Sequence, residues 1–217
     1  MIGEKKKKSP WRALAGAAIV LSIAGIAGQN VLASLNATAF NTVAQNTNAG
    51  TLKLDLANSG NGFGQSITNL APGDVVNRYV TLTNSGTLDG IGLSLQTSQS
   101  GTATLISDGV GGSSNQALKL TVTSCSVAWD TSTGTCSGTQ SSEITATTLG
   151  SLASAVNLTS SSLNAGANRY LQMKLQLPNQ NETTVNGTLP ANTVQGGSID
   201  ITYTFDLAQR VAATTNS

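Results

Sequence analysis

Two cysteines, Cys125 and Cys136, are the residues of this sequence best placed for chemistry, with ten residues between them. The polar residues 130–134 are typical of a turn, and two strands folded back around that turn would bring the two sulfurs together. In an oxidising compartment the pair would close as a disulfide, which stabilises a loop of this length by roughly 3 kcal/mol in the chain-entropy model. A pair of free thiols is the alternative. A zinc site fits less well, because two cysteines without histidine complete a tetrahedral set only with carboxylates.

Histidine is absent from all 217 residues. A zinc-binding HExxH helix, a Ser-His-Asp triad and a Cys-His pair all require it, so the sequence excludes these three kinds of catalytic site. The glycine-rich residues 109–112 lie in a polar stretch without the Lys-Ser/Thr of a phosphate-binding loop. Carboxylates in a close pair would suit glycoside hydrolysis, but no motif pairs them, and strand faces or turn caps are the simpler interpretation. We therefore predict that the protein is not an enzyme and holds no cofactor and no metal.

The first 33 residues have the pattern of an export signal. Four lysines at positions 5–8 precede residues 13–28, an uncharged run that is shorter than the roughly 20 residues needed to cross a bilayer. Small residues follow, so a cut between Ala33 and Ser34 is expected, with a cut after Ala37 as the second choice. We predict that residues 1–33 are a helical signal peptide removed by a signal peptidase. An uncleaved N-terminal anchor is the alternative.

The remaining chain carries few charges. Cleavage after residue 33 leaves six basic and nine acidic residues, a net charge of −3. Without a basic cluster the mature chain has no electrostatic attraction for phosphates, so nucleic acid is not an expected partner. No second hydrophobic segment follows the signal, which predicts a mature chain without a membrane span.

Alternation with a period of two predicts strands with one buried face. Residues 75–83 form one such stretch, although Arg78 interrupts its apolar face and suggests a bulge or a late start. In the other five stretches the apolar side chains fall at alternate positions: Leu52, Leu54 and Leu56; Ile91, Leu93 and Leu95; Leu118, Leu120 and Val122; Leu171, Met173, Leu175 and Leu177; and Ile199, Ile201, Tyr203, Phe205 and Leu207. Strands at this spacing predict an all-β fold, a single antiparallel β-sandwich over residues 50–217.

Turn signals lie between these strands. Pro72 and Gly73 occupy the central positions of a predicted type II turn. Residues 84–87 separate two strands closely enough to predict a hairpin. Residues 98–115 and 180–195 are long and polar and are predicted to be loops, whereas residues 148–163 fit either a loop or a short helix.

Three stretches in this order resemble the TasA/camelysin family of exported bacterial matrix proteins. The first runs from Ala39-Phe40 to Gly50-Thr51-Leu52-Lys53-Leu54-Asp55-Leu56, the second from Asn69-Leu70-Ala71-Pro72-Gly73-Asp74 to Asn84-Ser85-Gly86-Thr87-Leu88, and the third comprises residues 195–205 with Gln209 following. The resemblance implies a jelly-roll-like sandwich, processing by a dedicated signal peptidase and assembly into fibres of an extracellular biofilm matrix. Some members are labelled metallopeptidases, a label that a chain without histidine does not support.

We therefore expect a secreted structural protein of the cell surface or biofilm matrix that assembles with further copies of itself, and with other matrix proteins as additional partners. A sandwich has edge strands, and an edge is a template for another chain. Residues 34–49 form a leader that is either a donor strand or an unstructured remnant of processing. A donor strand would take its register from Ala37, Ala39, Phe40 and Val43. The alternatives are a monomeric adhesin or ligand-binding module that uses the two long loops, and a secreted peptidase or other hydrolase.

Overall fold

The structure is a computed structural model, and it describes residues 49–59, 70–110, 115–180 and 182–214. Contacts between Cα atoms place these residues in one compact unit, Asn48–Ser217. The predicted signal peptide lies outside the described residues, and so do the predicted cleavage and assembly positions, Ala33, Ser34, Ala37, Ala39, Phe40 and Val43. In the described part of the chain, no helix is long and apolar enough to cross a membrane.

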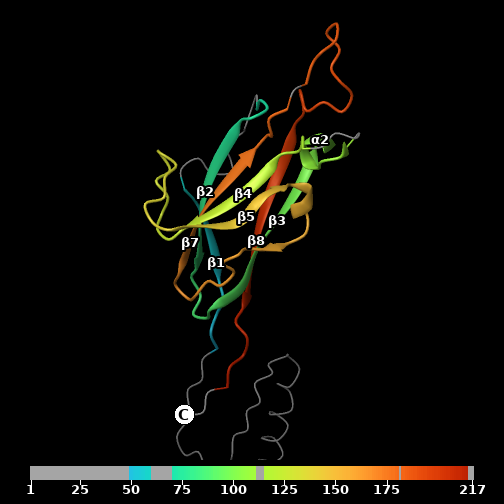
Figure 1. The fold of residues 1–217 in the computed structure, drawn as a ribbon. Coiled ribbons are helices and arrows are strands. Elements are labelled where there is room, and N and C mark those ends of the chain that lie inside the picture. The colour runs from blue at the N-terminus through green and yellow to red at the C-terminus, as the bar shows by residue number, and fades with distance from the viewer. Residues whose placement is uncertain (1–48, 60–69, 111–114, 181, 215–217) are drawn as a thin grey trace, which may run out of the picture. The chain divides into compact units, whose positions relative to one another are not determined.

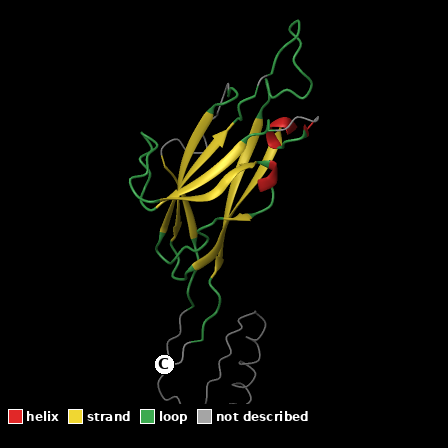
Figure 2. Ribbon diagram, in the orientation of Figure 1, coloured by secondary structure: helices red, strands yellow, loops and turns green. Residues whose placement is uncertain are grey.

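Two antiparallel sheets form the fold, with almost no helix (Figures 1 and 2). The five-stranded sheet has the order β1 (Leu54–Ser59), β2 (Val75–Asn84), β7 (Asn168–Gln176), β4 (Lys119–Cys125) and β5 (Gln140–Thr148). The three-stranded sheet has the order β6 (Val156–Asn157), β3 (Gly90–Gly101) and β8 (Ile199–Gln209). Two helical elements of the fold are short: α2 (Ala103–Ile106) and the 3-10 turn η2 (Gly150–Leu152). The predicted all-β sandwich is confirmed.

The core lies between the two sheets and is built by alternate residues of each strand. In β7, Leu171, Met173 and Leu175 are at most 5% exposed, as the alternation predicts. Leu82 of β2 and Leu95 of β3 meet them from the neighbouring strand and the opposite sheet and are completely buried. Each such side chain stabilises the fold by roughly 1.5–3 kcal/mol relative to an exposed position.

A β-bulge changes the face on which one predicted core residue lies. Leu93 and Leu95 are fully buried, but Ile91 is 38% exposed. The register with β8 shifts between Ile91 and Ser94, and Gly92 has a φ of +65°. An extra residue in one strand reverses the alternation, so the prediction that Ile91 shares the buried face was wrong.

The turn after β2 is not a hairpin, because β2 and β3 belong to different sheets. Asn84 is completely buried, and its side-chain nitrogen donates hydrogen bonds to the carbonyls of Leu88 (2.8 Å) and Leu163 (3.0 Å). These bonds hold the chain in an arch from one sheet to the other. The bulge suggested at Arg78 is also absent, because β2 pairs with β7 without a shift from Val75 to Thr83.

The predicted type II turn is confirmed by the bond from Asp74 N to Ala71 O (2.9 Å) and by the φ of +93° at Gly73. Residues 148–163 contain no α-helix: β5 ends at Thr148, and η2 and the two-residue strand β6 follow. The predicted loop 98–115 is shorter than expected, because β3 continues to Gly101 and α2 follows it.

Candidate functional site

The most distinctive surface of the described chain is the free edge of β8. On one side this 11-residue strand pairs with β3, from Gly101↔Ile199 to Gly90↔Gln209. On its other side no described residue forms a ladder with it. A free edge presents a row of main-chain N–H and C=O groups that can bind a further strand.

The inward face of β8 is not completely covered. Its five inward side chains pack against the core but none is buried: Ile199, Ile201, Tyr203, Phe205 and Leu207. Tyr203 lies near Arg78 of β2, and burial raises the pKa of its phenol to about 12 while the charge of Arg78 acts in the opposite direction. The phenol therefore stays neutral at ordinary pH. Compared with the inward face of β7, the face of β8 retains apolar surface that is open to solvent.

The strand β1 also exposes apolar surface. Since Tyr203 of β8 lies near Arg78 of β2, and β1 is the edge strand next to β2, β1 is on the β8 side of the sandwich. Leu56 pairs with the buried Leu82, and residues that face each other in an antiparallel ladder point to the same side of the sheet. Leu56 therefore points toward the interior, yet 45% of it is exposed. We call β8 with its free edge, together with Leu56, the open flank.

The two edges of the five-stranded sheet are less suited to pairing. The strand β1 has only six residues, and the ladder between β5 and β4 shifts register at two places. Short and bulged strands are two ways in which proteins protect edges, and lysine and proline are two others. Between Ile199 and Asp206 the ladder of β8 with β3 is regular, and β8 contains neither lysine nor proline. The open flank is thus the least protected edge among the described strands.

The two cysteines have a structural role. Cys125 and Cys136 form a disulfide with an S–S distance of 1.98 Å and close the loop between β4 and β5. This loop lays Trp129 on the outer face of the five-stranded sheet, where its ring centroid is 5.8 Å from that of Tyr79 and its Nε1 donates a hydrogen bond to Tyr170 O (3.3 Å). The two sulfurs are therefore bonded to each other and are not free for metal binding or for nucleophilic chemistry.

Carboxylates in this loop and in the core are occupied by local hydrogen bonds. Hydrogen bonds from Ser132 and Thr133 lower the pKa of Asp130 to about 2. Glu143 is 4% exposed and accepts hydrogen bonds from Ser124 Oγ (2.5 Å) and Ser160 N (2.7 Å). In both cases local hydrogen bonds satisfy the carboxylate: Asp130 in a turn of the disulfide loop, and Glu143 at the register shift of β5.

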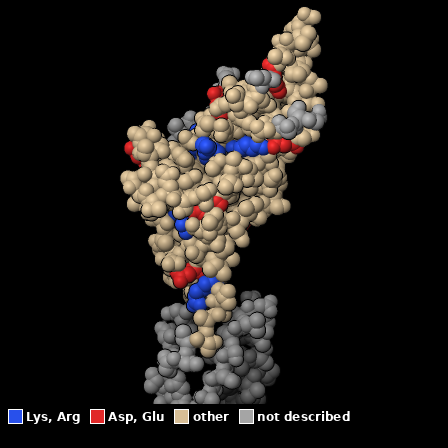
Figure 3. Space-filling view, viewed as in Figure 1, with Lys and Arg blue, Asp and Glu red and all other residues tan. Residues whose placement is uncertain are grey.

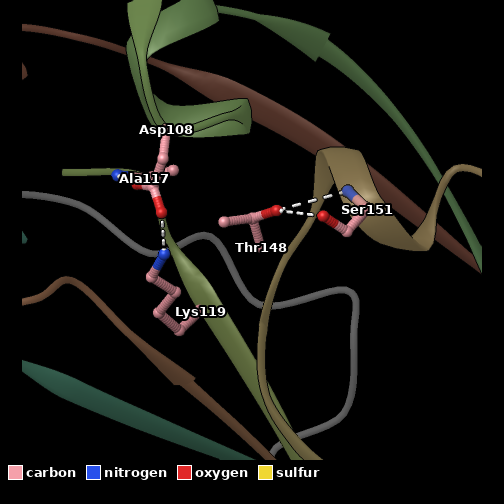
Figure 4. A network of polar contacts seen from close by, with 5 residues as sticks. All are labelled: Asp108, Ala117, Lys119, Thr148 and Ser151. Atoms are coloured by element: carbon pink, nitrogen blue, oxygen red, sulfur yellow. Dashed lines mark hydrogen bonds and ion pairs between the residues drawn. The ribbon is translucent and has the colours of Figure 1, made fainter. Parts of the chain in front are cut away.

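The carboxylate of Asp108 links the segment that follows α2 to the sheet (Figure 4). Asp108 forms an ion pair with Lys119 at the start of β4 and accepts a hydrogen bond from Ala117 N (3.0 Å). Burial would raise the pKa of Asp108, but the bonds from Lys119 and Ala117 outweigh it and hold the pKa below its ordinary value. Thr148 and Ser151 join β5 to η2 nearby through their hydroxyls (2.8 Å). This is a structural network, since every group in it is paired within the chain.

Charge does not create a binding surface either. Figure 3 shows that neutral residues cover most of the visible face, with a short row of basic side chains that adjoins acidic ones and a few separate charges elsewhere. The two ion pairs of the described residues, Lys53–Asp55 and Lys119–Asp108, pair four of the few charged groups with one another.

Among the described residues, no three His, Cys, Asp or Glu side chains lie close enough together to hold a metal ion. The sequence as a whole has no histidine. The leader and signal predicted from the sequence remain predictions, because the structure does not describe them. The open flank, by contrast, was not predicted, since the order of strands in a sheet depends on contacts between distant residues.

A family model described as camelysin metallo-endopeptidase matches residues 6–214 of the chain. The comparison with curated proteins found no match. The description of the family implies a catalytic metal, usually bound by histidine and carboxylate side chains in zinc peptidases. The donor set of this chain does not fit such a centre, because histidine is missing and both cysteines are bonded in a disulfide.

Proposed function

The chain belongs to the camelysin family, and we propose that it is a secreted structural protein of the cell surface or extracellular matrix. Copies of the chain join into fibres by β-strand addition, in which an extended segment of one copy extends a sheet of the next. The observation that carries this proposal is the open flank, with its regular free edge along β8 and its incompletely covered apolar face.

The donor in this proposal is the leader, residues 34–49. At about 3.3 Å per residue, its 16 residues reach about 50 Å, which exceeds the roughly 36 Å of the 11-residue β8. Main-chain hydrogen bonds supply the affinity. Ala37, Ala39 and Val43 lie at odd positions and share one face of the donor strand, which covers the remaining open surface of the inward face. Phe40 points to the opposite face, and the four side chains together set the register.

Removal of the signal peptide controls this assembly. Before cleavage, residues 34–49 continue from residues 1–33 and are tethered to them. Cleavage after Ala33 gives the leader a free N-terminus, so that it can lie along the edge of a neighbouring copy. A signal peptidase is therefore the one processing partner that the proposal requires, and fibres form only outside the cell.

The proposal contains no enzymatic step. A chain without histidine, with its cysteines in a disulfide, does not present a histidine-bound zinc centre, a Ser-His-Asp triad or a Cys-His pair. The family match therefore supports a common ancestry and fold. The proposed function of this member rests on the free edge of β8.

The test compares three forms of the mature protein by light scattering and electron microscopy: the chain from Ser34, a deletion of residues 34–48, and Ala39→Pro, which removes a main-chain donor. The first is expected to form filaments, and the other two to remain folded monomers. Ala39→Ser is the matched control, because it keeps the main-chain N–H and should assemble. If the deleted chain forms the same filaments, the leader is not the donor. If the mature chain stays monomeric at all concentrations, a monomeric binding module becomes the better assignment.

A further inference from the structure

Residues 182–197 form an arm between β7 and β8 that extends beyond the ends of these strands (Figure 1). Its tip is a tight turn in which Val185 and Thr188 exchange main-chain hydrogen bonds of 3.0 and 2.9 Å. Asn186 and Gly187 occupy the centre with φ values of +51° and +77°, as a two-residue hairpin turn requires. Val185 is 69% exposed and Leu189 is 42% exposed. The arm therefore presents an uncharged tip with two exposed apolar side chains to solvent.

The base of the arm is fixed to the body. The carboxylate of Glu182 accepts hydrogen bonds from Val194 N (2.9 Å) and from the Thr193 hydroxyl. Gln116 donates to Asn192 O (3.2 Å), and Val194 is 6% exposed and packs into the core. An arm that is ordered in advance loses little conformational entropy when it binds. Its exposed tip is therefore suited to contact with another molecule.

We call the end of the sandwich that bears the arm the head and the opposite end the tail. The tail holds the start and the end of the sandwich chain: Thr87 N donates to Thr51 O (2.7 Å), and Arg210 N donates to Asp89 O (2.9 Å). The strand β8 begins next to the arm and ends at the tail, so its length separates the two ends. The tail also exposes apolar side chains, with Ile91 at 38% and Val211 at 77%.

The relative direction of two copies follows from strand geometry, and this step rests on the proposed function. All six strand pairs of the two sheets are antiparallel. A leader that continues this pattern runs antiparallel to β8 of the acceptor, so its C-terminal end lies at the acceptor's head. That end of the leader leads directly into the donor's tail at residue 49. The tail of the donor therefore faces the head of the acceptor, and the acceptor's arm lies beside that tail.

We infer that the arm is a head-to-tail docking element whose partner is a second copy of this chain. The tip formed by Val185 and Leu189 packs against the exposed apolar side chains of the donor's tail, Ile91 and Val211. The contact joins two different surfaces and does not close on itself, so repetition produces an open filament. Assembly then has two components, in which the leader supplies main-chain bonds and the arm supplies an apolar contact that fixes the angle between copies.

The experiment uses charge exchange in the mature full-length chain. Val185→Asp and Val211→Lys each place a charge in the proposed contact and should raise the critical concentration for filament formation about tenfold, measured by sedimentation at low salt. The double variant Val185→Asp/Val211→Lys should restore assembly to within about threefold of the wild type, because the two charges meet between copies. Val127→Asp is the matched control, since Val127 is 41% exposed in the disulfide loop and should change nothing.

A cross-linking variant tests the same contact directly. Both native cysteines are already bonded in the disulfide, so Val185→Cys/Val211→Cys adds a reactive pair. Oxidation of its filaments should give a ladder of covalent oligomers, whereas each single variant gives dimers at most. If Val185→Asp assembles like the wild type while deletion of residues 34–48 prevents assembly, the docking inference is overturned and the strand proposal stands. If wild-type protein forms no filaments, both the strand-addition proposal and the docking inference are overturned.

Discussion

Removal of the disulfide is the perturbation whose effect the structure determines best. The bond closes a loop of 12 residues counted from Cys125 to Cys136, and in the chain-entropy model this closure stabilises the fold by roughly 3 kcal/mol. Cys125 is 4% exposed at the end of β4, so a small apolar substitution there is tolerated better than a polar one. We predict that Cys125→Ala/Cys136→Ala lowers the free energy of unfolding by about 3 kcal/mol, which corresponds to a fall in Tm of roughly 6–12 °C for a domain of this size.

Tryptophan fluorescence is the appropriate assay. The sequence has two tryptophans, Trp11 in the predicted signal and Trp129 in the disulfide loop, so the mature protein reports only on Trp129. Urea titrations of the oxidised protein, the reduced protein and the double variant should give two destabilised curves that agree with each other. Thr131→Ala, at an exposed position of the same loop, serves as the control and should remain within about 0.5 kcal/mol of the wild type. Equal midpoints for the oxidised and reduced proteins would refute the reasoning, as would free thiols in the unreduced native protein.

Three other predictions concern processing, metal content and the core. N-terminal sequencing of the secreted protein should begin at Ser34, or second at Thr38, and recovery of Met1 from the membrane fraction would contradict cleavage. Metal analysis of purified protein should return less than stoichiometric zinc, and peptidase activity should disappear on repurification; one tightly held zinc per chain would overturn the assignment. Leu82→Ala should destabilise the fold by about 2–5 kcal/mol in urea titrations, because Leu82 is fully buried, whereas Leu56→Ala, at a 45% exposed position, should cost the mature monomer less than about 1 kcal/mol.

The strands that the sequence predicts well are those whose two faces have different surroundings. The strand β7 is central in its sheet, with the core on one side and solvent or the disulfide loop on the other, so its alternation is complete from Leu171 to Leu175. The strand β5 was missed because its buried residues are adjacent, Glu143 and Ile144, at the point where the register shifts. A period of two is invisible in a strand whose alternation is interrupted by a bulge.

The hairpin that was predicted wrongly after β2 depends on residues far away in the sequence. The arch at Asn84 is fixed by a carbonyl 79 residues away, Leu163 O, and no local pattern indicates that partner. For the same reason, short spacing alone could not show that β2 and β3 lie in different sheets. The candidate site has the same origin. The alternation of β8 predicts one buried face, whereas the order of the strands shows that its edge is free and the burial of its side chains shows that this face is incompletely covered.

The composition of the chain links its stability to its proposed assembly. Few charges and many small polar residues allow regular strands. The same composition leaves β8 without the lysines or prolines that protect many edge strands from pairing with another chain. The open flank therefore has two consequences at once. It lowers the stability of the isolated sandwich, because apolar surface of β8 and Leu56 stays in contact with water, and it gives a bound strand that same surface to cover. A ligand that binds only the folded state stabilises it by mass action, so the donor segment of a neighbouring copy would raise the unfolding temperature of the acceptor, and the filament would be more stable than the monomer from which it forms.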